Sequence, residues 1–165
     1  MYKLQAAVKT AGIKNTGKLT RDDLAHVTQQ YLAALARAVC ECGIPKSLIY
    51  VHQGGTYPPW GVHIPFRAAF NDWAAPAWSF YGQDPNEIGQ LSRELDQCGR
   101  TRWAAAEWWW GAPDKTGWLE HFGRTLRFRD CRFIAVYNWN CGYKFKEEKA
   151  GQEALRDLVT HWQEQ

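Results

Sequence analysis

Four segments with β-strand character alternate with helical segments along the chain, and this alternation restricts the fold more than any other feature. The strand candidates are 47–52, 76–81, 103–107 and 131–139, and a segment with helical character follows each of them. A helix that begins at Thr20, its N-cap, precedes the first strand. Strands that alternate with helices favour parallel pairing through right-handed crossovers. The 165 residues therefore predict a single α/β domain, 1–165, built from four βα units.

The remaining helices are expected where apolar residues recur at helical spacing between the strands. These segments are 4–11, 66–73, a helix from Asp84 to just before Gly99, 114–126 and 146–162. Asp84 precedes Pro85, which is the pattern of an N-cap followed by proline at the first helical position.

Each predicted strand ends in polar or aromatic residues, and a glycine-bearing turn follows. The ends are His52-Gln53, Tyr81, Glu107 with the tryptophans after it, and Asn138-Trp139. Parallel βα units place the carboxyl ends of all strands on one face, which carries the chemistry in barrels. We therefore expect these residues to converge although they are far apart in the sequence.

Glu107 stands inside the run Trp103-Ala-Ala-Ala-Glu107-Trp108-Trp109-Trp110 and is its one carboxylate. Burying a carboxylate is costly unless it has a partner. The chain holds ten tryptophans, more than a core of this size normally needs, so some indole is expected to face a ligand. A carboxylate among flat apolar rings is typical of a sugar-cleaving site. The alternative is a core strand whose Glu107 bends out to water.

The arrangement resembles the C-terminal half of a (β/α)8 barrel of the clan A glycoside hydrolases. In that clan the seventh strand ends in a catalytic glutamate, a position that Glu107 matches, and the eighth commonly contributes a tryptophan under the sugar, which Trp139 matches. The resemblance implies that the four strands are strands five to eight of a TIM-type barrel, an incomplete barrel in this chain. It also implies a retaining glycoside hydrolase of a β-linked sugar with Glu107 as the nucleophile.

The chain departs from the clan in one respect that matters for activity. The clan takes its acid/base carboxylate from the end of the fourth strand, yet residues 1–18 contain no Asp or Glu. Retaining hydrolysis needs two carboxyl groups about 5 Å apart. The chain is therefore expected to be half of a larger protein, and by itself to be weak or inactive as a catalyst.

Substrate-binding roles are predicted for seven residues at or near the strand ends. They are His52, Gln53, Trp78, Tyr81, Trp108, Asn138 and Trp139, with Trp108 and Trp139 favoured for stacking on the sugar. His52 either binds a hydroxyl or carboxylate or is structural. Tyr81 either holds the nucleophile ionised and oriented or packs in the core.

Further candidates have a structural interpretation that is favoured over a functional one. Asp84 could be a substitute acid, but an N-cap role is favoured for it. His63 is expected to pack in its loop, His121 to be structural on a helix, and Asp72 to be solvated on a helix. The histidines lack metal-ligand spacing and Gly54-Gly55 lacks the pattern of a phosphate loop, so no metal or cofactor is implied.

Composition and charge argue against several partner classes. The net charge of +3 is spread without a basic run, which argues against nucleic acid, and no apolar run is long enough for a membrane span. The N-terminal residues have no signal-peptide pattern, and the compartment stays open. The five cysteines are interpreted as mostly reduced thiols.

Three functional hypotheses follow from the sequence. The first is the glycoside hydrolase described above, and the second is a non-catalytic carbohydrate-binding domain that uses the same aromatic face. The third is a half barrel with no function alone, which needs a partner chain. An open sheet edge favours association, so the partner is either a second copy in a homodimer or a missing N-terminal half.

Overall fold

The computed structural model describes residues 20–53, 66–81, 85–137 and 144–163, and their fold is α/β. Four strands form one sheet in the order β1-β2-β3-β4, and every neighbouring pair is parallel. The strands are β1 (Tyr50–Gln53), β2 (Ala75–Phe80), β3 (Arg102–Trp108) and β4 (Asp130–Val136). This topology confirms the predicted α/β alternation with parallel strands.

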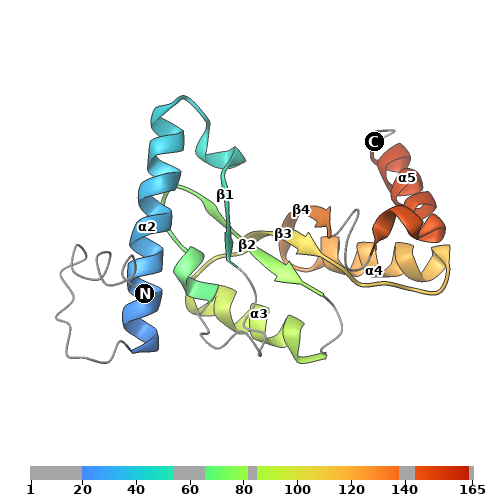
Figure 1. The fold of residues 1–165 in the computed structure, drawn as a ribbon, viewed down its shortest axis with the longest axis horizontal. Coiled ribbons are helices and arrows are strands. Elements are labelled where there is room, and N and C mark those ends of the chain that lie inside the picture. The colour runs from blue at the N-terminus through green and yellow to red at the C-terminus, as the bar shows by residue number, and fades with distance from the viewer. Residues whose placement is uncertain (1–19, 54–65, 82–84, 138–143, 164–165) are drawn as a thin grey trace.

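Within the described residues, four α-helices flank this sheet. They are α2 (Arg21–Glu41), α3 (Pro85–Gln97), α4 (Lys115–Arg127) and α5 (Lys149–Gln163). Three short 3₁₀ helices, η1 (Lys46–Leu48), η2 (Phe66–Ala69) and η3 (Phe145–Glu147), lie between the longer elements. Figure 1 shows α2 on the β1 side of the sheet and α4 and α5 on the β4 side.

The start of α2 agrees with the prediction from Thr20. The Thr20 hydroxyl accepts from the Asp23 backbone N–H, and the Asp23 carboxylate accepts from the Thr20 backbone N–H in return. This capping box satisfies two donors that a helix start otherwise leaves open. The Thr20 hydroxyl also donates to the Asp23 carboxylate at 2.7 Å, and this bond, together with the one from the Thr20 backbone N–H, lowers the pKa of Asp23.

Two predicted elements differ from the structure. Ser47 belongs to η1 rather than to a strand, because Leu48 and Ile49 donate their N–H groups back to Pro45 and Lys46. The helix predicted for 66–73 is only η2. Its continuation is prevented by Asn71, whose side-chain oxygen accepts from the N–H groups two and three residues ahead and turns the chain into β2.

The helix predicted for 4–11, the predicted N-cap Asp84 and the end of the fourth predicted strand at 138–139 lie outside the described residues. Within them, β4 begins at Asp130 and ends at Val136. The helices predicted for 114–126 and 146–162 correspond to α4 and to η3 with α5.

One face of the sheet is buried against the helices. Its strand residues are Trp78, Phe80, Trp103, Ala105 and Trp108, and they pack with Leu91 and Leu95 of α3 and with Trp118 and Phe122 of α4. Aromatic rings of this size each remove a large apolar area from water. The helix-covered face is therefore the main core of the described chain.

On the opposite face, the two central strands carry small side chains and the sheet is curled. Ala77 and Ala104 are register partners on the two central strands and are fully buried. Tyr50 of β1 reaches Phe133 of β4, with ring centroids 4.8 Å apart. In a flat sheet these two outer strands would be about 14 Å apart. Small central side chains and a curled sheet together bring the outer rings into contact.

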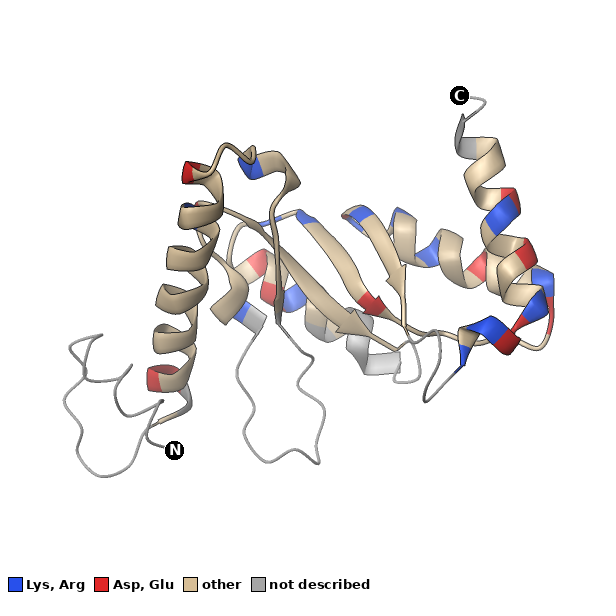
Figure 2. Cartoon of the chain, turned by 45° about the horizontal axis from the view of Figure 1, so that its top comes forward, with Lys and Arg blue, Asp and Glu red and all other residues tan. Residues whose placement is uncertain are grey.

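The charged residues are mostly on the helices and turns, as Figure 2 shows. In the strands, Arg102, Asp130 and Arg132 occur in the first half of β3 or β4, and only Glu107 lies near a carboxyl end. Among the described residues, no helix is both long and apolar enough to cross a membrane.

Candidate active site

An irregularity in β3 decides the direction of Glu107. Strict alternation from Trp103 and Ala105 would turn Glu107 toward the helices. The pairing of β2 with β3 instead shifts, because Trp78 pairs with Ala105 while Ser79 pairs with Glu107. The extra residue works as a β-bulge, a device that re-aims a side chain next to functional sites. Glu107 therefore shares the curled face with Ser79.

The Glu107 carboxylate is held at both oxygens. Ser79 Oγ donates to Oε2 at 2.6 Å, and the Tyr81 hydroxyl donates to Oε1 at 2.6 Å. His52 Nε2 lies 2.8 Å from Ser79 Oγ and 3.7 Å from Glu107 Oε2. We call His52, Ser79, Tyr81 and Glu107 the strand-end cluster. Its members come from β1, from β2 and the residue after it, and from β3.

Among the described residues, neutral hydroxyls rather than Lys or Arg hold the Glu107 carboxylate. Glu107 is 20% exposed, and among the described residues no Lys or Arg forms an ion pair with it. The two hydroxyl donors fix the orientation of the Glu107 carboxylate. The arrangement provides a held oxygen nucleophile or base.

The order of the hydrogen bonds excludes a serine-hydrolase triad. In a triad the histidine stands between the serine and the carboxylate, so that one ring nitrogen serves each. Here Ser79 stands in the middle, contacts both His52 and Glu107, and is only 3% exposed. A buried hydroxyl that already donates to a carboxylate is not placed to attack a substrate.

The structure brings together three of the residues that the sequence singled out and adds a fourth. Glu107, His52 and Tyr81 converge. Tyr81 contacts the carboxylate, which the interpretation of Tyr81 as a residue that orients the nucleophile requires. Ser79 was missed. A signal existed, because Ser79 and Tyr81 are two residues apart at the end of one strand and so share a face.

The two tryptophans of the sheet that were predicted to bind sugar lie in the core. Trp78 and Trp108 are 1% and 0% exposed. Trp108 donates its Nε1–H to Thr125 Oγ1 at 2.9 Å and stacks on Phe122 at 4.6 Å between centroids. Neither indole presents a face to a ligand, so the prediction that Trp108 stacks on a sugar is corrected. The bulge explains this, since it turns Glu107 outward and Trp108 inward.

Most of the other described tryptophans have structural roles as well. Trp103, Trp109 and Trp118 are buried. Trp110 stacks on His121 at 4.2 Å between centroids and lies under the Arg124 guanidinium. Core packing therefore uses more indole than the composition suggested.

The remaining predicted residues fall in three groups. Asn138 and Trp139 lie outside the described residues, as do His63 and Asp84, and of Gln53 only the backbone is described. His121 is structural on α4, where its Nδ1 meets the Trp110 carbonyl oxygen at 2.9 Å. Asp72 is solvated as predicted but lies outside any helix, 3.4 Å from Arg100 Nη2.

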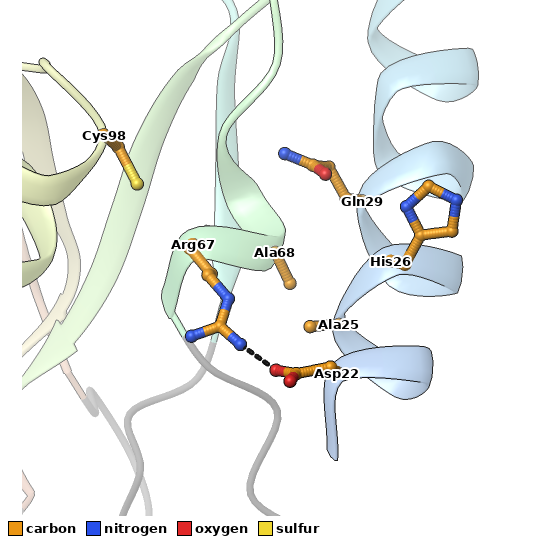
Figure 3. Close-up of a pocket in the computed structure, with 7 residues that line it drawn as sticks. All are labelled: Asp22, Ala25, His26, Gln29, Arg67, Ala68 and Cys98. Atoms are coloured by element: carbon orange, nitrogen blue, oxygen red, sulfur yellow. Dashed lines mark hydrogen bonds and ion pairs between the residues drawn. The ribbon is translucent and has the colours of Figure 1, made fainter. Parts of the chain in front are cut away.

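A separate hollow of about 390 Å³ lies between α2 and η2 (Figure 3). Its wall includes an ion pair between Arg67 and Asp22, and His26, Gln29 and Cys98 also line it. No member of the strand-end cluster reaches it. Its polar groups connect α2 to the segment before β2, because Arg67 pairs with Asp22 and Gln29 donates to the Phe70 carbonyl oxygen.

In the part of the chain that the structure describes, no group of three or more His, Cys, Asp or Glu side chains is placed to hold a metal ion. The cysteines there, Cys40, Cys42, Cys98 and Cys131, are free thiols. Comparisons with protein-family models, with curated proteins and with solved structures find no match for the chain.

Proposed function

We propose that the chain carries the nucleophile of a retaining glycoside hydrolase that acts on a β-linked sugar, and that Glu107 is this nucleophile. The observation that carries the proposal is the pair of hydrogen bonds that fixes the Glu107 carboxylate. Its carboxylate accepts 2.6 Å hydrogen bonds at both oxygens from neutral hydroxyls, at the carboxyl end of a parallel strand. A partly buried carboxylate that is oriented by neutral hydroxyls, with no Lys or Arg ion pair among the described residues, is a candidate for chemistry rather than for stability.

The curl of the sheet supports a barrel-type architecture as part of the same proposal. Parallel strands that alternate with helices, together with a curled sheet, suit four units of a (β/α)8 barrel, strands five to eight. In such a barrel the strand-end cluster would lie on the face where catalytic residues gather.

The cluster as described contains a single carboxylate. In a retaining reaction Glu107 attacks the anomeric carbon while a second carboxyl group, about 5 Å away, protonates the leaving oxygen. The proposal therefore places the acid/base group outside this cluster.

A substrate whose leaving group needs no proton tests the nucleophile by itself. We would incubate the full chain with 2-deoxy-2-fluoro-β-glycosyl fluorides of gluco, galacto, manno and xylo configuration. Attack by a Glu107 oxygen forms an ester bond to the anomeric carbon and releases fluoride, and the 2-fluoro group slows hydrolysis of that ester. Peptide mass spectrometry is expected to place the label on Glu107, and Glu107→Gln is expected to abolish it.

The outcomes separate the three hypotheses. Label on another residue, or uptake that survives Glu107→Gln, contradicts the assignment of the nucleophile. Sugar binding by calorimetry without any label in the wild-type chain favours a carbohydrate-binding domain. If the chain shows no sugar binding and no label, the hypothesis of a chain that is inactive until its partner is present is favoured.

A further inference from the structure

The hydroxyl of Ser79 lies between two polar partners and can satisfy them in one way only. It is 2.6 Å from Glu107 Oε2 and 2.8 Å from His52 Nε2. An ionised carboxylate only accepts hydrogen bonds, and a serine hydroxyl has one proton to donate. The Ser79 proton therefore goes to Glu107, and Ser79 Oγ must accept from His52. The hydrogen-bond network thus assigns a proton to Nε2 of His52.

The three side chains form a chain of donors that runs in one direction. His52 Nε2–H donates to Ser79 Oγ, and Ser79 Oγ–H donates to Glu107 Oε2. Hydrogen bonds in series polarise one another, so the first bond strengthens the second. The residues are on adjacent strands β1, β2 and β3, so the sheet fixes the path.

His52 reaches the carboxylate only through Ser79. The distance from Nε2 to Oε2 is 3.7 Å, beyond a hydrogen bond. The His52 side chain is 41% exposed, whereas Ser79 is 3% exposed and has no water-facing alternative for its proton. Without His52, the Ser79 hydroxyl loses the donor that polarises it, so its own hydrogen bond to Glu107 becomes weaker.

We propose that His52 is a positioning residue for Glu107 and acts through the buried hydroxyl of Ser79. The proposal rests on the proposed role of Glu107 as nucleophile. His52 holds Ser79 Oγ as an acceptor and thereby commits its proton to Oε2, while Tyr81 holds Oε1. With both oxygens occupied, the carboxylate keeps one orientation toward a bound anomeric carbon.

The first test compares labelling rates of four variants with the fluorosugar that labels the wild-type chain. His52→Ala and Ser79→Ala are each expected to label about tenfold more slowly, the size of one lost hydrogen bond. The double variant is expected to be no slower than either single one, because both changes break the same path. His52→Gln keeps an N–H donor near the position of Nε2 and is expected to stay within about twofold of wild type. Thermal unfolding checks that each variant is folded.

The second test detects the hydrogen-bond relay from His52 through Ser79 to Glu107 without any turnover. NMR of ¹⁵N-labelled protein at pH 8 is expected to show a hydrogen-bonded Nε2–H for His52, which Ser79→Ala removes and Tyr81→Phe leaves. His121 is the internal reference, because its Nδ1 faces the Trp110 carbonyl oxygen and must carry the proton there. A merely structural His52 would keep its Nε2–H signal in Ser79→Ala.

The two tests distinguish failure of the relay from failure of the proposed function. Additive losses in the double variant, or a His52→Gln rate as low as that of His52→Ala, overturn the positioning role. A His52 signal that ignores Ser79→Ala overturns the relay whatever the labelling shows. If the signal responds to Ser79→Ala and not to Tyr81→Phe but no fluorosugar labels the chain, the relay stands and the nucleophile role of Glu107 is lost.

Discussion

Tyr81 donates a 2.6 Å hydrogen bond to Oε1 of Glu107, although 26 positions separate the two residues in the sequence. The bond spans neighbouring parallel strands and links the end of β2 to the end of β3. It fixes one carboxylate oxygen while Ser79 fixes the other. The Tyr81 ring also meets Tyr137, beyond the end of β4, at 6.1 Å between centroids.

Removing the Tyr81 hydroxyl is expected to slow the chemistry without unfolding the protein. Tyr81→Phe keeps the ring and its packing on Tyr137 but leaves Oε1 without this donor. The rate of fluorosugar labelling at Glu107 is expected to fall about tenfold, while the midpoint of thermal unfolding changes little. An unchanged labelling rate would show that Tyr81 only packs in the core.

Replacing Trp108 is expected to affect stability and not ligand binding. Trp108→Phe removes the buried bond from Nε1 to Thr125 and leaves space beside Phe122. The free energy of unfolding in urea is expected to fall by about 1–3 kcal/mol. Labelling per folded molecule is expected to stay at the wild-type rate, and a loss of labelling would restore Trp108 as a ligand-binding residue.

Two helical glycines are expected to respond oppositely to alanine. A Cβ on Gly151 of α5 would lie 2.7 Å from Phe145 Cε2 and 2.9 Å from Trp118 Cε2, so Gly151→Ala is expected to destabilise the fold. A Cβ on Gly89 of α3 meets only the end of Arg93, at 3.6 Å. Gly89→Ala is the matched control and is expected to stabilise by about 0.5–1 kcal/mol through helix propensity. Denaturant unfolding of both variants checks the pair.

Cys131 is expected to make the fold less stable in alkali. Burial raises the pKa of its thiol from 9.0 to about 11. Below pH 9 the thiol is protonated in both states and contributes no pH dependence. Between pH 9 and about 11 the unfolded thiol ionises first, so the unfolded state binds fewer protons and the free energy of unfolding falls as pH rises.

Cys131→Ala is expected to flatten this part of the curve of unfolding free energy against pH. The exposed thiol of Cys42 provides the control, because Cys42→Ala is expected to leave the slope unchanged. Equal slopes in wild type and Cys131→Ala would contradict the assignment of the slope to this thiol.

The isolated chain is expected to associate through an uncovered apolar stripe. Tyr31, Leu35 and Val39 recur every fourth residue on α2 and are 62%, 48% and 41% exposed. Contiguous apolar surface of this kind favours association. In sedimentation velocity, the sedimentation coefficient of the wild-type chain is expected to rise with concentration. The coefficient of Leu35→Glu is expected to be lower than that of the wild type. Ala34→Glu, on the same helix but off the stripe, is the control, and a wild-type monomer at all concentrations would contradict the expectation.

Much of the fold could be predicted because local patterns and long-range packing agree. The capping box at Thr20, the Asp114 N-cap of α4 and the apolar runs of the strands each specify a local structure, and the alternation of elements specifies parallel pairing. The helix expected over 66–73 failed for a local reason that was present in the sequence. Asn71 ends it by accepting two backbone N–H groups.

The sequence by itself determined that Glu107 stands at the end of a strand and that His52 and Tyr81 stand at the ends of two others. Strand ends and turn glycines are local features, and parallel βα units make such ends converge. Only the tertiary structure decided which face each side chain takes. The register shift between β2 and β3 turns Glu107 to Ser79 and sends Trp108 into the core, the reverse of what alternation gives. A bulge is a compromise between two strands and the helices that pack on them, so no property of β3 alone specifies it.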